Sequence, residues 1–135
     1  MSLIEKTVLG VMSGTSLDGV DLAMLHFEKK EVWEYSILAT ATLPYPEEWL
    51  DHLRHAVDLS KHALTVLDRD YTLYLAKIIQ DFLAEQPLPP DFVSSHGHTV
   101  LHQPDKGITY QIGNLASLAE VIGHKVICNF RVADV

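Results

Sequence analysis

The sequence has very little cysteine and little positive charge. Cys128 is the only cysteine, so no disulfide can form within the chain, and this composition is typical of a reducing compartment. Ten Lys and Arg stand against 18 Asp and Glu, a formal net charge of −8. Such a chain is a poor nonspecific ligand for nucleic acids and anionic membranes, because both are polyanions. We expect no nucleic-acid partner.

Long apolar runs are also missing, and we expect no secretory leader. No stretch of about 18 consecutive apolar residues is present, so nothing in the sequence predicts a membrane-spanning helix. The first ten residues, MSLIEKTVLG, are too few and too acidic for a signal peptide. We therefore expect a cytoplasmic protein without a membrane partner.

What the chain does have is enough apolar material for a core. It is 135 residues long, with 47% hydrophobic and 21% charged residues, which excludes the disordered class. The length suits one domain, by the usual prior of roughly 100–200 residues per domain. No internal repeat, low-complexity segment or linker divides it.

The first third of the sequence predicts strands, and the middle predicts helices. Apolar and β-branched runs at 7–12, 20–27 and 32–43 are joined by short turns, which predicts an antiparallel meander. Pro46, followed by two glutamates, is typical of a first helical turn. A longer helix is indicated by apolar residues spaced by three and four, before prolines at 87–90 end it. These residues are Leu64, Leu67, Tyr71, Tyr74, Leu75, Ile78, Phe82 and Leu83.

The last third returns to strands. Residues 91–95 predict a short strand that stops at 96–98, and residues 99–102 and 108–112 can pair across a turn. A helix over 115–122 can be capped by Gly113 or Asn114 and ended by Gly123. A further strand is expected at 125–128. The fold class is therefore α/β, with a three-strand antiparallel meander, helices and further strands in one mixed sheet.

The densest chemical signal is the segment GVMSGTSLDGVD at residues 10–21. Its glycines allow backbone N–H groups to approach an anion, and Thr15 and Ser16 add hydroxyl donors. Asp18 and Asp21 offer the carboxylate oxygens that magnesium prefers. A polar hairpin turn made of ordinary turn residues is the competing interpretation. The segment is not a Walker motif, because no lysine follows the glycines.

Taken whole, this segment resembles the N-terminal signature of the anhydro-N-acetylmuramic acid kinase family. The resemblance continues in SSHGHTVLHQP at 94–104, YQIGN at 110–114 and NFRVAD at 129–134. The four blocks occur in the family's order. They span nearly all of this chain but only the N-terminal portion of a typical member.

The resemblance implies a fold and a cofactor. The family belongs to the two-lobed sugar kinase, actin and heat-shock chaperone class, so residues 1–135 would be the N-terminal lobe, ribonuclease H-like and actin-like, with the second lobe absent from this chain. ATP and Mg²⁺ would bind at the first hairpin turn, and the carboxylates of Asp18 and Asp21 would hold the metal. The residues implied for this turn are Gly14, Thr15, Ser16, Asp18, Gly19 and Asp21.

It also implies a reaction. Family members use water to open the anhydro ring of 1,6-anhydro-N-acetylmuramic acid and phosphorylate O6 with ATP, in peptidoglycan recycling. Asp134 is the expected base. His96, Gly97, Thr99 and Arg131 are expected near the sugar. Asn129 departs from the family, which usually has aspartate there.

Two other interpretations stay open. His96, His98 and His102 could bind zinc in a hydrolase, since His-x-His on a strand places both rings on one face. A non-catalytic actin-like or chaperone-like nucleotide-binding module is the second, although such a module has no reason to carry the 129–134 block.

The missing lobe bears on activity and assembly. We expect the chain alone to have negligible kinase activity and weak ATP binding, because a second lobe would supply the adenosine pocket. Exposed apolar surface that faces the other lobe would favour self-association or a homodimer.

Overall fold

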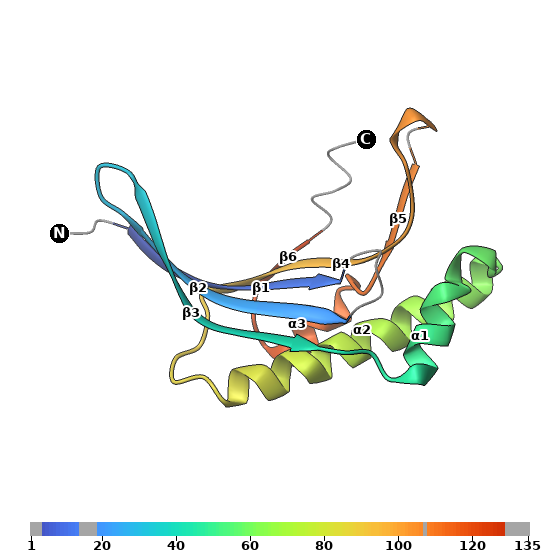
Figure 1. The fold of residues 1–135 in the computed structure, drawn as a ribbon, viewed down its shortest axis with the longest axis horizontal. Helices are drawn as coiled ribbons and strands as arrows, with labels where there is room; N and C mark the ends of the chain where they lie inside the picture. The colour runs from blue at the N-terminus through green and yellow to red at the C-terminus, as the bar shows by residue number, and fades with distance from the viewer. Residues whose placement is uncertain (1–3, 14–18, 107, 129–135) are drawn as a thin grey trace.

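The computed structural model describes residues 4–13, 19–106 and 108–128, with no side-chain description at 101–104, 108 and 109. Six strands form one mixed sheet in the described part of the chain, in the order β3-β2-β1-β4-β5, with β6 paired to β4. The helices lie together along one face of this sheet (Figure 1). The α/β class with one mixed sheet is confirmed.

The N-terminal meander is confirmed. Strands β1 (Ile4–Ser13), β2 (Val20–Lys29) and β3 (Trp33–Leu43) pair antiparallel in sequence order. Along β1 the side chains alternate between the two faces, as the pleat requires. Leu9 and Val11 are buried against the helices, while Met12 is exposed on the other face. The sheet is therefore packed on one side only in the described part of the chain.

Two helices and a short 3-10 turn connect β3 to β4. Helix α1 (Glu47–Arg54) begins directly after Pro46, which occupies the N-cap position. The 3-10 turn η1 spans Ala56–Asp58, and helix α2 spans Lys61–Ala84. Helix α2 begins earlier than the apolar stripe indicates, because the Ser60 hydroxyl accepts the Ala63 N–H at 3.2 Å. It ends before Pro87, as predicted.

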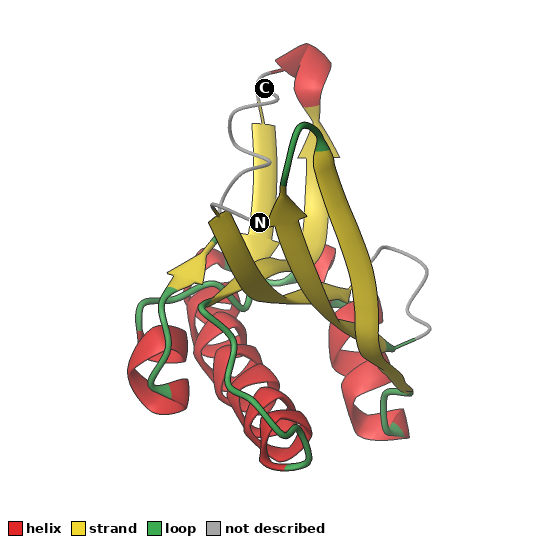
Figure 2. Cartoon of the chain, turned by 90° about the vertical axis from the view of Figure 1, so that its left-hand side faces the viewer, coloured by secondary structure: helices red, strands yellow, loops and turns green. Residues whose placement is uncertain are grey.

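The predicted apolar face of α2 forms the centre of the core. Leu67, Tyr71, Leu75, Ile78 and Phe82 are buried, and the remaining members of the predicted stripe pack partly buried against them. The helices lie beneath the sheet when the molecule is turned to its side (Figure 2). Among the described residues, none of the helices combines the length and apolarity needed to cross a bilayer.

Strand β4 (Phe92–Gln103) pairs parallel to β1, which the crossover through α2 makes possible. Its second half pairs antiparallel with β5 (Ile108–Ile112) across the 3-10 turn η2 (Pro104–Lys106), as predicted. Helix α3 (Ser117–Ile122) follows, ended by Gly123 in the left-handed conformation. Strand β6 (Val126–Ile127) then pairs parallel to β4.

Two local predictions are wrong. The strand starting near residue 91 does not stop at 96–98, because β4 continues through Gly97 as a bulge and its register against β1 shifts there. Helix α3 is not capped by Gly113 or Asn114, since Ala116 occupies its N-cap without a side-chain bond. The Asn114 side chain is bonded to β4 instead.

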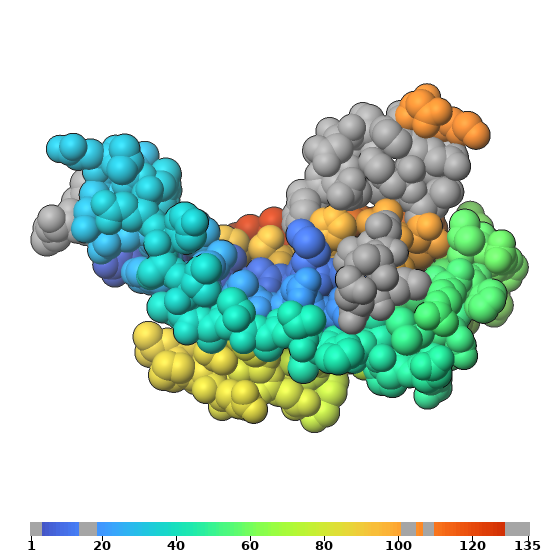
Figure 3. Space-filling model, viewed as in Figure 1, coloured from blue at the N-terminus to red at the C-terminus, as the bar shows by residue number. Residues whose placement is uncertain are grey.

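The uncovered face of the sheet is concave. The β2–β3 end and the β4–β5 end both curve away from the helices in Figure 1, and the space-filling view shows the molecule hollowed between them (Figure 3). A hollow of about 420 Å³ lies on this face over the end of β1, the start of β2, the end of β3 and the first half of β4. It is the setting of the candidate site.

Candidate functional site

The hairpin between β1 and β2 carries the predicted phosphate turn. Gly14, Thr15, Ser16 and Asp18 lie outside the described residues, so their expected roles stay predictions. Gly19 is described and closes the turn with φ of +148°. A Cβ at this position would lie 2.9 Å from Pro44 Cα and collide with the Leu43 carbonyl group. The β2 side of the turn therefore packs so closely on the end of β3 that only glycine fits.

Asp21 is an exposed carboxylate on the open face of β2. It lies opposite Met12 on β1 and Thr42 on β3, and its Oδ1 accepts the Thr42 hydroxyl at 2.6 Å. A single carboxylate can suit Mg²⁺, because this ion commonly keeps several waters and binds substrate phosphates. In the described part of the chain, no three His, Cys, Asp or Glu side chains gather as a metal cage. The expected role of Asp21 as a magnesium ligand stays a prediction.

The two central histidines of the 94–104 block point to opposite sides of the sheet. His96 lines the hollow on the open face together with Gly10 and Met12. His98 faces the helices, where its Nδ1 lies 3.2 Å from Ser13 Oγ and its ring contacts Tyr71 at 6.0 Å between centroids. The expectation that both rings share one face is wrong, because the bulge places two residues of β4, His96 and Gly97, opposite one residue of β1 and so reverses the alternation of side chains.

This geometry removes His96 and His98 as joint ligands of one zinc ion. The side chain of His102 lies outside the described ones. The zinc interpretation needed the three rings to converge, and two of them are separated by the sheet itself.

The bulge is held by Asn114, which follows β5. Its Nδ2 donates to the His96 carbonyl at 3.2 Å, and its Oδ1 accepts the Ser95 hydroxyl at 3.0 Å. Gly97 adopts φ of +73°, and a Cβ there would meet the Ile112 carbonyl oxygen at 2.6 Å. Asn114 thus holds the bulge in β4, after which His98 faces the helices.

Thr99 lies beyond the bulge and is buried. Its Oγ1 accepts a hydrogen bond from Gln111 Nε2 of β5 at 3.1 Å. This bond ties β4 to β5. Its expected place near the sugar stays a prediction.

The open hollow brings Asp21 and His96 to one place, although they are 75 positions apart in the sequence. The parallel pairing of β4 with β1 creates this neighbourhood, since it aligns Ser94 with Gly10. The described side chains and backbone that line it come from four neighbouring strands. They include Gly10, Met12, Asp21, Ala23, Thr40, Thr42, Ser94 and His96.

Three buried polar residues were not singled out from the sequence as site residues. Ser13 Oγ is hydrogen-bonded to the Tyr45 hydroxyl, which lies 2.5 Å from the Tyr71 hydroxyl. Burial raises the pKa of Tyr45 and raises that of Tyr71 well above its usual value. The one available signal was that Ser13 belongs to the 10–21 block, because a tyrosine in an apolar stripe reveals nothing about where its hydroxyl points.

Asp68 on α2 is a partly buried polar residue that was also not singled out from the sequence. Its Oδ1 accepts the Gly113 N–H at 2.7 Å and the Thr72 hydroxyl at 3.4 Å. Burial raises the pKa of this carboxyl, an effect that the Gly113 and Thr72 hydrogen bonds partly oppose. The signal was available: Asp68 stands four residues after Leu64 and four before Thr72, on the core side of the helix.

The 129–134 block lies outside the described residues. The expected roles of Arg131 near the sugar and of Asp134 as the base therefore stay predictions.

Comparison with known proteins gives a consistent result. The chain is 42% identical over 130 residues to the anhydro-N-acetylmuramic acid kinase of Paramagnetospirillum magneticum, covering 94% of this chain and 36% of that protein. It is 40% identical over 135 residues to the enzyme of the same name from Pseudomonas putida, with the same coverage. The Acaryochloris marina protein is 38% identical, with 94% of this chain and 35% of that protein covered.

The chain therefore spans about a third of the length of these relatives. A family model described as anhydro-N-acetylmuramic acid kinase matches residues 6–135. The mixed sheet with its antiparallel meander agrees with an actin-like, ribonuclease H-like ATPase lobe. On the motif blocks, the fold and these matches together, this chain belongs to the anhydro-N-acetylmuramic acid kinase family.

Proposed function

We propose that residues 1–135 are the N-terminal lobe of a kinase that phosphorylates 1,6-anhydro-N-acetylmuramic acid with ATP. The observation that carries the proposal is the family match over residues 6–135, which includes all four motif blocks. The relatives named for this activity are longer proteins, and this chain corresponds to about a third of their length. The second lobe would complete the site, so the chain alone would be inactive.

The first hairpin would bind the nucleotide's phosphates. The packing of Gly19 against Leu43 and Pro44 supports this, since it anchors one side of the turn that holds Gly14, Thr15 and Ser16. Asp21 and Asp18 would hold Mg²⁺, which would neutralise the phosphate charge. Because the Thr42 hydroxyl donates to Asp21 Oδ1, the carboxylate is oriented before any ligand arrives.

The anhydro-sugar would lie on the side of the sheet that His96 reaches. The shared hollow of His96 and Asp21 supports placing sugar and metal on one face. Gly97, Thr99 and Arg131 would shape or contact the sugar site. In the proposed reaction Asp134 accepts a proton from the water that attacks C1, the C1–O6 bond breaks, and O6 receives the phosphoryl group.

This activity would place the protein in the cytoplasm, in the recycling of cell-wall amino sugar. Its small-molecule partners would be ATP and the anhydro-sugar.

The test is product analysis with the intact enzyme. Incubation with ATP, Mg²⁺ and the anhydro-sugar should yield a product heavier than the sugar by one water and one HPO₃ unit, seen by mass spectrometry. Nucleotide turnover that is indifferent to the anhydro-sugar would overturn the proposal and favour the non-catalytic module.

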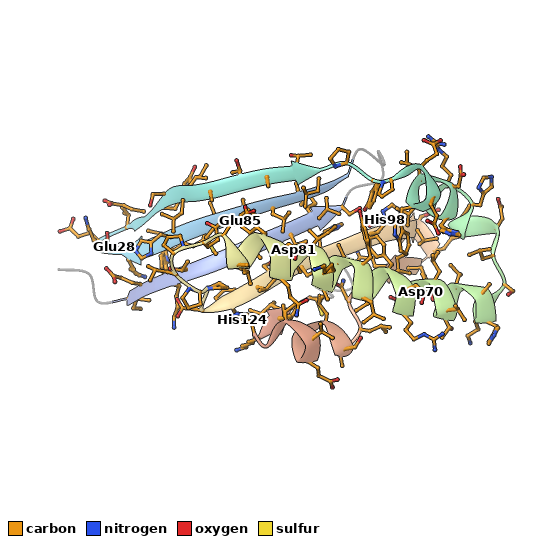
Figure 4. The ribbon with its side chains drawn as sticks, turned by 90° about the horizontal axis from the view of Figure 1, so that it is seen from below. Glu28, Asp70, Asp81, Glu85, His98 and His124 are labelled. Atoms are coloured by element: carbon orange, nitrogen blue, oxygen red, sulfur yellow. The ribbon has the colours of Figure 1, made fainter. Side chains whose placement is uncertain are left out.

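Variants assign the roles. Asp134→Asn should lower turnover by about 100-fold or more, the usual contribution of a positioned base. Asp21→Asn should raise the Mg²⁺ concentration needed for half-maximal rate. Asp81→Asn is the matched control, because Asp81 is an exposed carboxylate on α2, across the sheet from the hollow (Figure 4). Unchanged magnesium dependence in Asp21→Asn would remove Asp21 from the metal site.

A further inference from the structure

Four polar side chains from four separate parts of the chain meet under the end of β1. They are Ser13 at the last position of β1, Tyr45 in the connection from β3 to α1, Tyr71 on α2 and His98 on β4. All four are buried, with Ser13 only 1% exposed and Tyr71 fully buried. This cluster, called the Ser13 network below, lies directly before the proposed phosphate turn.

The hydrogen bonds link the four side chains in series. Tyr71 and Tyr45 are joined by their hydroxyls, Tyr45 is joined to Ser13 Oγ, and Ser13 Oγ is joined to His98 Nδ1 at 3.2 Å. If Tyr71 donates to Tyr45, Tyr45 donates to Ser13 and Ser13 donates to His98 Nδ1, each of the three hydroxyl protons is used in one hydrogen bond. The raised pKa values of Tyr45 and Tyr71 keep both phenols protonated, so each retains a proton to donate.

The surrounding core does not need these hydroxyls for packing. Leu75, Val11 and Ile112 fill the neighbouring interior, and a phenylalanine at position 45 or 71 would keep the ring contacts. A buried polar group costs free energy unless it is hydrogen-bonded, so a polar chain here needs each of its members. Its location is specific: Ser13 and His98 are register partners immediately after the shift in the β1–β4 pairing.

We propose that the Ser13 network positions the phosphate turn by tying the last residue of β1 to α2 and β4. The role rests on the proposed function, since it concerns nucleotide binding at that turn. Ser13, Tyr45, Tyr71 and His98 are positioning residues that need not touch ATP themselves. Their hydrogen bonds fix the end of β1, from which the turn leaves.

The test uses hydroxyl deletions in the intact enzyme. Tyr45→Phe and Tyr71→Phe remove one oxygen each and keep the ring. We expect Tyr45→Phe to raise both the Kd for MgATP, measured by calorimetry, and the KM for ATP by about fivefold. The KM for the anhydro-sugar should change by less than about twofold. Tyr71→Phe, one bond further from Ser13, should give a smaller rise in the same direction.

Tyr74→Phe is the matched control. Tyr74 lies on the same helix and packs against Tyr45 at 6.1 Å between ring centroids, but the hydroxyl of Tyr45 is bonded to those of Ser13 and Tyr71. Its Kd for MgATP should match the wild type. A purely structural network would lower the unfolding temperature of Tyr45→Phe and leave its Kd and KM for ATP unchanged, which would overturn the inference.

Binding and turnover separate this inference from the proposed function. A wild-type enzyme that binds MgATP but does not phosphorylate the anhydro-sugar would contradict the function alone, and the Kd values of the variants would still decide the role of the network. A wild-type enzyme that binds no nucleotide would overturn both. Should Tyr45→Phe fail to fold, Tyr71→Phe supplies the same comparison.

Discussion

His96 and His98 are separated by one residue, yet they lie on opposite faces of the same sheet. His96 lines the open hollow, while His98 bonds Ser13 and contacts Tyr71 on the helix side. The left-handed Gly97 between them allows the bulge, and Asn114 holds it through two hydrogen bonds. One motif block therefore serves two separate environments, the candidate sugar side and the core network under the phosphate turn.

Gly97→Ala should destabilise the protein strongly. The alanine would be held at a positive φ of 73° and its Cβ would meet the Ile112 carbonyl oxygen at 2.6 Å and Asn114 Nδ2 at 2.7 Å. The backbone strain alone costs about 1–3 kcal/mol, and the collision adds to it. Urea unfolding followed by circular dichroism measures the loss.

Gly123→Ala is the matched control for that substitution. Gly123 has a similar φ of 72°, but a Cβ there would meet nothing within 4 Å. The free energy of unfolding that Gly123→Ala loses should reflect the backbone strain without the collision. Equal losses in the two variants would show that the close approach of β4 to Ile112 and Asn114 contributes nothing.

Asn114→Ala should lower the free energy of unfolding by about 1–3 kcal/mol, because it leaves the Ser95 hydroxyl and the His96 carbonyl without their bonds to Asn114. Gln80→Ala is the control: Gln80 Nε2 also donates to a backbone carbonyl, that of Val121 at 3.0 Å, but in an exposed position. A loss no larger than that of Gln80→Ala would contradict the clamp role of Asn114.

Asp68 should make stability fall as pH rises. Burial raises the pKa of its carboxyl in the folded state, so the folded protein holds this proton at pH values where the unfolded chain has lost it. Stability from this group is fully present below the unfolded pKa of roughly 3.9 and is lost as pH rises through the higher folded pKa. Asp68→Asn cannot titrate, yet its amide oxygen can still accept the Gly113 N–H.

Unfolding of the wild type and Asp68→Asn at a series of pH values from acid to neutral checks this. The stability of the wild type relative to the variant should decrease as pH rises. Asp70→Asn removes an exposed carboxylate from the same helix and controls for the change in helix charge. A relative stability that increases with pH would contradict the sign.

His96 and His98 should carry their ring protons on different nitrogens. The Gly97 carbonyl, 3.2 Å from His96 Nδ1, can only accept, so that nitrogen holds a proton. His98 Nδ1 accepts from Ser13 in the chain of hydroxyls, which leaves its proton on Nε2. Long-range ¹H–¹⁵N NMR of the imidazoles distinguishes the two tautomers.

His55 is the reference for that spectrum, because its Nδ1 lies 2.9 Å from the Asp51 carbonyl oxygen and must donate. Finding His98 protonated at Nδ1, as in His55, would reverse the direction of the Ser13 network.

The sequence by itself determined the local structure and the family. The meander follows from short runs of apolar and β-branched residues joined by turns, and α2 from the stripe that includes Tyr71 and Leu75, because both signals depend on neighbours along the chain. The four motif blocks identified the family through residues in order, which needs no coordinates. Gly123 ended α3 as expected for the same local reason.

Only the tertiary structure decided which of these residues meet. The parallel pairing of β1 with β4 joins residues more than 80 positions apart, and periodicity along one strand carries no information about its partner. A bulge then reversed the side that His98 faces, and Asn114 proved to hold β4 where the sequence suggested a helix cap. The bond between the Tyr45 and Tyr71 hydroxyls depends on the packing of α2 under the sheet, a nonlocal contact that hydrophobic spacing cannot express.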